Sequence, residues 1–261
     1  MKTSPDSLRL FNITISNLKF EQFCEQINDH IKQGQHGYVL TPNVNHVCLC
    51  HRDPHFHEIY QHALHAIPDG TPIMWAASLF GTPLHEKLSG SDMVPKLSAY
   101  AAKNDLSVYF LGGSPGTAEQ TAKTLKIKHP KLIIAGTDCP AYGFEKDPQL
   151  LQETIDKVSR AKPQICFIAL GSPKQEYFMY QHQNELGAAI TIGVGASFDF
   201  MAGRIKRAPH WLQSIGLEWF WRLAMEPRRL WKRYLVEDVI FFKLLWNEFK
   251  KHKHPNASQS S

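Results

Sequence analysis

Asp69 is the residue in this chain best suited to acid–base chemistry. It stands between Pro68 and Gly70, in a stretch over 62–81 that holds no other acidic residue. Apolar neighbours such as Trp75 would raise the pKa of its carboxyl, which suits a general base that works near neutral pH. Pro-Asp-Gly is also a common turn sequence, so the same residue could serve only to reverse the chain.

Short apolar runs alternate with helical patterns between residues 37 and 200. The expected strands, some with the loop that follows, cover 37–43, 106–116, 131–137, 163–173 and 188–195. The expected helices between them cover 117–130, 147–162 and 174–186. Strands that are apolar throughout and separated by helices are typical of a parallel sheet covered on both faces. The sequence therefore predicts a Rossmann-like α/β fold.

Ligands of such sheets bind at the carboxyl ends of the strands. The residues expected at that edge are Thr41, Asn43, Gly112, Gly113, Gly136, Gly171 to Glu176, and Gly195 to Asp199. The turn at Gly112 and Gly113 could bring backbone N–H groups to a phosphate, or could be only a tight strand-to-helix turn. Gln175 could reach a sugar or a base, whereas Glu176 could simply interact with the dipole of its helix.

Basic and aromatic residues concentrate in the last quarter of the chain. The net charge is +5, and from Arg204 onward there are twelve Lys and Arg against five Asp and Glu. Five of the six tryptophans lie between Trp211 and Trp246. This composition is typical of an interfacial membrane helix, although a helical hairpin packed on the core would share it. No apolar run approaches the ~20 residues of a membrane-spanning helix, and we expect no signal peptide.

Cysteine, histidine and acidic spacings indicate neither a disulfide framework nor a metal site. Cys48 and Cys50 are two residues apart at an expected strand end, a poor geometry for a disulfide, so we expect reduced thiols in a cytosolic protein. The fourteen histidines form no metal-binding pattern, and no D-x-D motif is present. An aromatic and arginine-rich segment could also suit RNA, but no recognised nucleic-acid motif accompanies it.

Seven segments, in this order and spacing, resemble the WecG/TagA/CpsF glycosyltransferases, family 26, over residues 8–240. They read TPNVNH, PDG, LSGSDMVPKL, FLGGSPG, LGSPKQE, VGASFDFMAGRIKRAP and GLEWFWRLAMEPRRLWKRYL. The resemblance implies an inverting enzyme that moves a sugar from UDP to a polyprenyl-diphosphate-linked sugar, in cell-surface polysaccharide or teichoic acid synthesis. N-acetylmannosamine and its uronic acid are the first-choice donors. Glucose or another hexose, or a non-catalytic nucleotide- or lipid-binding scaffold, remain alternatives.

The resemblance also implies roles for individual residues. Asp69 would be the general base, with Thr41 beside it. The substrate site would be formed by Asn43, Gly112, Gly113, Gln175, Glu176, Gly195 and Asp199. The lipid diphosphate would be clamped by Arg222, Arg228, Arg229 and Arg233, because guanidinium binds phosphate in a bidentate fork. Pro72 departs from the glycine that many members have, which leaves the donor sugar open.

The sequence thus predicts three segments and a set of partners. Residues 1–203 would form the catalytic domain, 204–250 a basic, Trp-rich helical appendage, and 251–261 a disordered tail. We expect metal-independent catalysis, with arginines and helix termini stabilising UDP. The expected partners are a UDP-sugar, a polyprenyl-diphosphate-linked acceptor and an anionic membrane surface, with no nucleic acid. The enzyme would lie on the cytoplasmic face of the cell membrane, and a homo-oligomer is compatible with the sequence.

Overall fold

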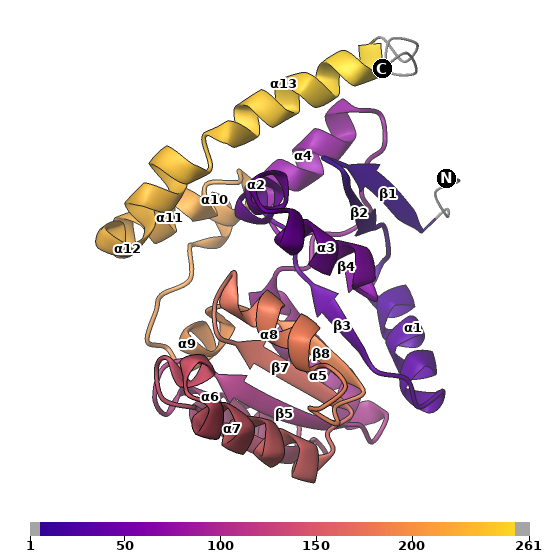
Figure 1. The fold of residues 1–261 in the computed structure, drawn as a ribbon, viewed down its shortest axis with the longest axis vertical. Coiled ribbons are helices and arrows are strands. Elements are labelled where there is room, and N and C mark those ends of the chain that lie inside the picture. The colour runs from indigo at the N-terminus through magenta and orange to yellow at the C-terminus, as the bar shows by residue number, and fades with distance from the viewer. Residues whose placement is uncertain (1–5, 254–261) are drawn as a thin grey trace.

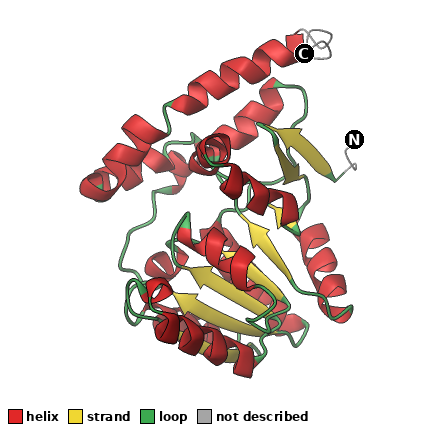
Figure 2. Ribbon diagram, in the orientation of Figure 1, coloured by secondary structure: helices red, strands yellow, loops and turns green. Residues whose placement is uncertain are grey.

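A six-stranded parallel sheet forms the centre of the fold (Figures 1 and 2). The computed structural model describes residues 6–253. The strands are β3 (Gly37–Leu40), β4 (His65–Ala66), β5 (Ser107–Gly112), β6 (Ile133–Asp138), β7 (Ile165–Ala169) and β8 (Ile190–Gly193). They lie in the order β4-β3-β8-β7-β5-β6, and every neighbouring pair is parallel. The predicted Rossmann-like class is confirmed.

Helices cover both faces of this sheet. One face carries α2 (Val44–Arg52), α3 (Pro54–His62), α7 (Pro148–Ala161) and α8 (Lys174–His182). The other carries α1 (Phe20–Lys32), α5 (Gly90–Lys103), α6 (Thr117–Lys128) and α9 (Ser197–Met201). Successive strand residues point to opposite faces, so Tyr109 joins the first cluster and Phe110 the second. Burial on both faces explains why the strands read as continuous apolar runs.

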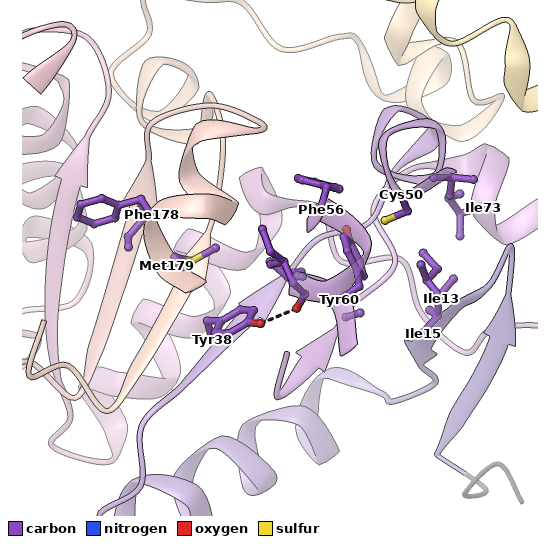
Figure 3. Packing of buried hydrophobic residues seen from close by; sticks show 14 of the residues in the cluster. Ile13, Ile15, Tyr38, Cys50, Phe56, Tyr60, Ile73, Phe178 and Met179 are labelled. Carbon is purple, nitrogen blue, oxygen red and sulfur yellow. Dashed lines mark hydrogen bonds between the residues drawn. The ribbon is translucent and has the colours of Figure 1, made fainter. Parts of the chain in front are cut away.

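A small hairpin extends the first of these two hydrophobic clusters. Its strands are β1 (Ser7–Leu10) and β2 (Ile13–Ser16), which pair antiparallel. Figure 3 shows Ile13 and Ile15 of β2 near Cys50 and Ile73. The expectation that Cys48 and Cys50 lie at a strand end is wrong. Asn43 caps α2 directly after β3, so both thiols are carried by a helix and are buried.

Three shorter segments complete the part of the fold before residue 203. Helix α4 (Thr71–Leu79) follows β4 and leads towards α5. A 3₁₀ turn, η1 (Phe144–Lys146), precedes α7. Buried Phe144 lies 5.8 Å from Phe178 of α8, centroid to centroid, which fixes this turn to the first face of the sheet.

The segment after residue 203 is helical and packs on the rest of the molecule. Its elements are α10 (His210–Ser214), α11 (Glu218–Met225), α12 (Pro227–Lys232), the π-helical turn η2 (Arg233–Glu237) and α13 (Ile240–Lys253), here called the C-terminal helices. Phe241 is buried, and its ring centroid lies 5.2 Å from that of Phe11 in the hairpin turn. Residues 254–261 of the predicted tail lie outside the described part. Within residues 6–253, no helix is both long and apolar enough to cross a bilayer.

Candidate active site

The carboxyl ends of the strands and the N-termini of several helices meet at one edge of the sheet. After β5 the chain continues outward to β6, whereas after β7 it continues to β8 on the other side. Such a reversal opens a crevice between β5 and β7. The helices that begin at this edge are α2, α5, α6, α8 and α9. Their N–H groups and dipoles make the crevice suitable for an anion such as a diphosphate.

Three of the predicted substrate-site residues, Gly112, Gly113 and Asp199, lie together at this reversal. Gly112 and Gly113 have φ of 95° and 82°, a region that favours glycine. A Cβ on Gly112 would lie 2.8 Å from a backbone oxygen of β7, and a Cβ on Gly113 would lie 3.1 Å from Phe198. Asp199 follows Phe198 on α9 and faces the same region. Its charge contributes to the raised pKa of the Cys139 thiol, and that thiol donates a hydrogen bond to the Gly113 carbonyl.

Asp69 lies at the same edge, on the loop between β4 and α4. Its N–H donates to the carbonyl of Pro42, at 2.8 Å, so the loop runs beside the chain that leaves β3. Gly70 then takes a φ of 105°, which turns the chain into α4. Four strand-to-strand steps separate β4 from β5, or roughly 19 Å at ~4.8 Å a step. The predicted base and the glycine turn therefore lie at opposite ends of one edge.

The Asp69 carboxyl has a pKa suited to proton transfer. Burial raises this pKa from its ordinary value of 3.8 to about 7. The charge of Glu218 on α11 contributes to this rise, while the charges of Lys87 and Arg222 oppose it. At neutral pH the carboxyl is thus divided between its two protonation states and can accept a proton.

Thr41 and Asn43 hold the chain next to Asp69 in place. The Thr41 side chain is buried, and its hydroxyl donates to the carbonyl of Gly193 at the end of β8, at 3.2 Å. The Asn43 oxygen accepts a hydrogen bond from the N–H of His46, at 3.2 Å, and so caps α2. Both residues have structural partners, and their predicted contacts with the sugar stay predictions.

A buried polar network joins α8 to α2 and to the loop after β8. Gln175 donates to Glu176 at 2.7 Å and accepts from the N–H of Gly195 at 3.0 Å. Glu176 Oε1 lies 3.6 Å from His46 Nε2, and His46 Nδ1 lies 2.6 Å from the Tyr60 hydroxyl. Burial raises the pKa of Glu176 to about 7 and lowers that of His46 to about 3. The amide of Gln175 therefore positions Gly195, and its predicted sugar contact stays a prediction.

Helix α11 brings one carboxylate and one guanidinium close to Asp69. Glu218 and Arg222 are four residues apart, one turn of the helix, and both act on the pKa of Asp69. The Arg222 guanidinium also stacks over Phe200 of α9, at 5.8 Å from the ring centroid. Arg222 is thus held between the two ends of the strand edge.

The other three predicted arginines are placed differently. Arg233 donates to the Asn43 oxygen at 3.4 Å, and its Nε lies 3.9 Å from Asp238 Oδ2. The π-helical turn brings these two residues together, because the Asp238 N–H donates to the Arg233 carbonyl. Arg228 is exposed on α12. The side chain of Arg229 lies outside the described residues.

An ion pair fastens the linker between α9 and α10 beside Asp69. Arg207 Nη2 lies 2.7 Å from Asp92 Oδ1, and the Ser89 hydroxyl donates to the other Asp92 oxygen at 2.6 Å. Ser89 caps α5 and Asp92 lies in its first turn, and the N–H of Leu88 donates to the carbonyl of Pro68 at 3.1 Å. The linker, the start of α5 and the Asp69 loop are therefore directly connected.

Comparison with known proteins shows the family of this chain. A model of the WecG/TagA/CpsF family of glycosyl transferases matches residues 8–255. The chain belongs to this family. It is 30% identical over 206 residues to an N-acetylglucosaminyldiphosphoundecaprenol N-acetyl-beta-D-mannosaminyltransferase of Bacillus spizizenii, covering 79% of this chain and 77% of that protein. It is 28% identical over 229 residues to a protein of the same name from Bacillus subtilis, covering 87% and 86%.

Membership of the WecG/TagA/CpsF family confirms the resemblance seen in the sequence. The protein is a glycosyltransferase, and the alternative of a non-catalytic scaffold is set aside. No three His, Cys, Asp or Glu side chains among residues 6–253 are grouped so that they could hold a metal ion. Metal-independent catalysis by this family member stays a prediction.

Sequence reasoning missed the charged residues that surround Asp69. Glu218, Lys87 and Asp92 all influence its pKa, yet none was singled out from the sequence. Two signals were available. Asp92 lies within LSGSDMVPKL, one of the family-like segments, and Glu218 stands one helical turn before Arg222. Neither signal shows that the two acids face Asp69, because that depends on how distant segments pack.

Proposed function

We propose that this enzyme transfers N-acetylmannosamine from UDP to an N-acetylglucosamine carried on polyprenyl diphosphate, with inversion at the anomeric carbon. The names of both Bacillus relatives support this donor sugar, this acceptor and a β product. A UDP-sugar carries its sugar in the α configuration, so a β product requires inversion. The reaction would supply cell-surface polysaccharide or teichoic acid at the inner face of the cell membrane.

The observation that carries this proposal is the Asp69 carboxyl, with a pKa of about 7 at the sheet edge. In the proposed reaction it removes the proton from the acceptor hydroxyl while that oxygen attacks the anomeric carbon. The bond from the sugar to UDP breaks on the opposite face. The donor would lie along the strand edge, with its nucleotide at Gly112 and Gly113 and its sugar near Thr41. Helix N-termini at this edge would stabilise the departing diphosphate.

The C-terminal helices would hold the lipid-linked acceptor. Arg222 lies near enough to Asp69 to change its pKa, so a diphosphate bound there would present its sugar to the base. Arg228, Arg229 and Arg233 would add further phosphate contacts. The exposed Trp and basic residues of these helices would hold the enzyme against an anionic bilayer.

A donor screen tests the proposed reaction. UDP release would be measured with UDP-N-acetylmannosamine, its uronic acid, UDP-N-acetylglucosamine and UDP-glucose, each with a polyprenyl-diphosphate-N-acetylglucosamine acceptor. We expect the N-acetylmannosamine donor to react fastest, and NMR to show a β linkage. If glucose were transferred faster, the proposed donor sugar would be wrong, but the proposed class of reaction would stand. If none of the four donors gave UDP release, or if the product were α-linked, the proposal would be contradicted.

The charges of Glu218 and Arg222 should shift the pH at which the enzyme becomes active. A general base works deprotonated, so kcat/KM should rise with pH through about 7, the pKa of Asp69. Glu218 raises that pKa, so Glu218→Gln should move the rising limb to lower pH. Arg222 lowers it, so Arg222→Gln should move the limb to higher pH. If kcat/KM rises over the same pH range in the wild type, Glu218→Gln and Arg222→Gln, Asp69 is excluded as the titrating group.

We predict that turnover needs no divalent metal. Enzyme treated with EDTA and then desalted should keep its full rate, measured as UDP release. Catalysis would instead depend on N–H dipoles and arginines at the diphosphate. Loss of turnover after EDTA, restored by Mg²⁺ or Mn²⁺ and not by Na⁺, would show this prediction to be wrong.

A further inference from the structure

Helix α4 presents an uncharged, apolar face to solvent. Trp75 and Leu79 lie one helical turn apart, and their side chains are 57% and 58% exposed. The sequence has no charged residue from Gly70 to Leu84. The solvent face of a helix in a soluble domain ordinarily carries charged side chains, and an exposed apolar patch marks an interaction site.

The exposed face of α4 is continuous with the C-terminal helices. A Cβ on Gly216, in the turn between α10 and α11, would lie 2.9 Å from the Trp75 ring and 3.1 Å from Thr71. This turn therefore packs directly on α4. Figure 1 shows α4 and the C-terminal helices at the same end of the molecule. Large apolar side chains exposed around this turn are Trp211, Ile215, Leu217, Trp219 and Phe220.

We propose that α4, through Trp75 and Leu79, is a second membrane-contacting element that docks the catalytic domain itself on an anionic bilayer. The charge of the segment that packs on α4 fits such a surface, since the chain from Arg204 onward carries twelve basic and five acidic residues. Tryptophan beside basic side chains is the composition that favours the bilayer interface. The contact is peripheral, because no described helix is long and apolar enough to span.

Docking through α4 has a direct consequence for the reaction. The helix begins at Thr71, two residues after Asp69, so a bilayer in contact with α4 lies close to the base. An acceptor diphosphate anchored in that bilayer would reach Asp69 without leaving the membrane surface. This consequence rests on the proposed function, whereas vesicle binding does not.

Vesicle binding by surface variants tests the docking. Full-length protein would be sedimented, without donor or acceptor, with vesicles of phosphatidylglycerol and phosphatidylcholine. We expect Trp75→Ser/Leu79→Ser to lower the partition coefficient by about tenfold or more, given the apolar area removed. Leu79→Ser alone, which keeps the contact between Trp75 and Gly216, should give a smaller loss. Ile127→Ser is the matched control, because Ile127 is 82% exposed on α6, and it should bind like the wild type.

Activity assays and sedimentation distinguish membrane docking by α4 from a place in the catalytic site and from a contact between subunits. Transfer to a long-chain acceptor in vesicles should fall in Leu79→Ser, while its transfer to a short, soluble acceptor should stay unchanged. Vesicle binding equal to wild type would overturn the proposal. So would an equal loss with both acceptors in Leu79→Ser, which would place α4 inside the catalytic site. A wild-type dimer that the double variant dissociates, with vesicle binding unchanged, would show that α4 is a contact between subunits.

Discussion

Asp69→Asn is expected to lower kcat by about 10²- to 10⁴-fold, the usual contribution of a general base. Asparagine has nearly the same shape as aspartate but cannot take the proton of the acceptor hydroxyl. Burial already raises the pKa of Asp69 to about 7, so the site tolerates a neutral group at this position. The variant should therefore fold normally and bind UDP as the wild type does. Steady-state UDP release and calorimetric titration with UDP would measure the two effects.

The control for Asp69→Asn is the same substitution at a remote acid. Asp105 is exposed in the turn before β5, where its φ of 54° is one that asparagine also accepts. Asp105→Asn should keep the wild-type rate. Unchanged turnover in Asp69→Asn would remove Asp69 from its role. Lost UDP binding with a lowered melting temperature would show that Asp69 is structural.

Arg233→Gln is expected to raise the KM for the lipid-linked acceptor by roughly 10- to 100-fold. This range corresponds to the loss of hydrogen bonds to a charged group, each about 1.5–3 kcal/mol. In the structure Arg233 contacts Asn43 and lies beside Asp238, which is 7% exposed. Burial raises the pKa of Asp238, and Arg233 offsets that rise. Part of the effect could therefore come from a weaker attachment of the C-terminal helices to α2.

Asp238→Asn distinguishes the two roles of Arg233. It removes the ion pair but keeps the arginine, and an asparagine oxygen can still accept from Asn45, which donates to Asp238 at 2.9 Å. If Arg233 binds the diphosphate, Asp238→Asn should lower the melting temperature without raising the acceptor KM. Equal increases of KM in both variants would mean that Arg233 acts only by holding the helices in place.

The strands and the edge at which they end could be predicted from the sequence. Runs such as VYFL in β5 and ICFI in β7 are buried on both faces, so they carry no polar positions and are recognised directly. The two-residue strand β4 could not be recognised, because a pairing so short leaves no hydrophobic pattern. The helix that carries Cys48 and Cys50 was missed because its cap, Asn43, follows β3 so closely.

The sequence by itself determined the class of fold and the family, and it supplied the candidate site residues such as Asp69. Local hydrophobic patterns and ordered motifs can be read in this way because they depend only on neighbours along the chain. Tertiary structure alone decided which charges act on Asp69. Glu218 and Arg222 are about 150 positions away and reach it through the packing of α11. Asn45 likewise meets Asp238 across 193 positions. Electrostatic and hydrogen-bonding partners depend on distance in space, and that distance is set by how buried surfaces fit together.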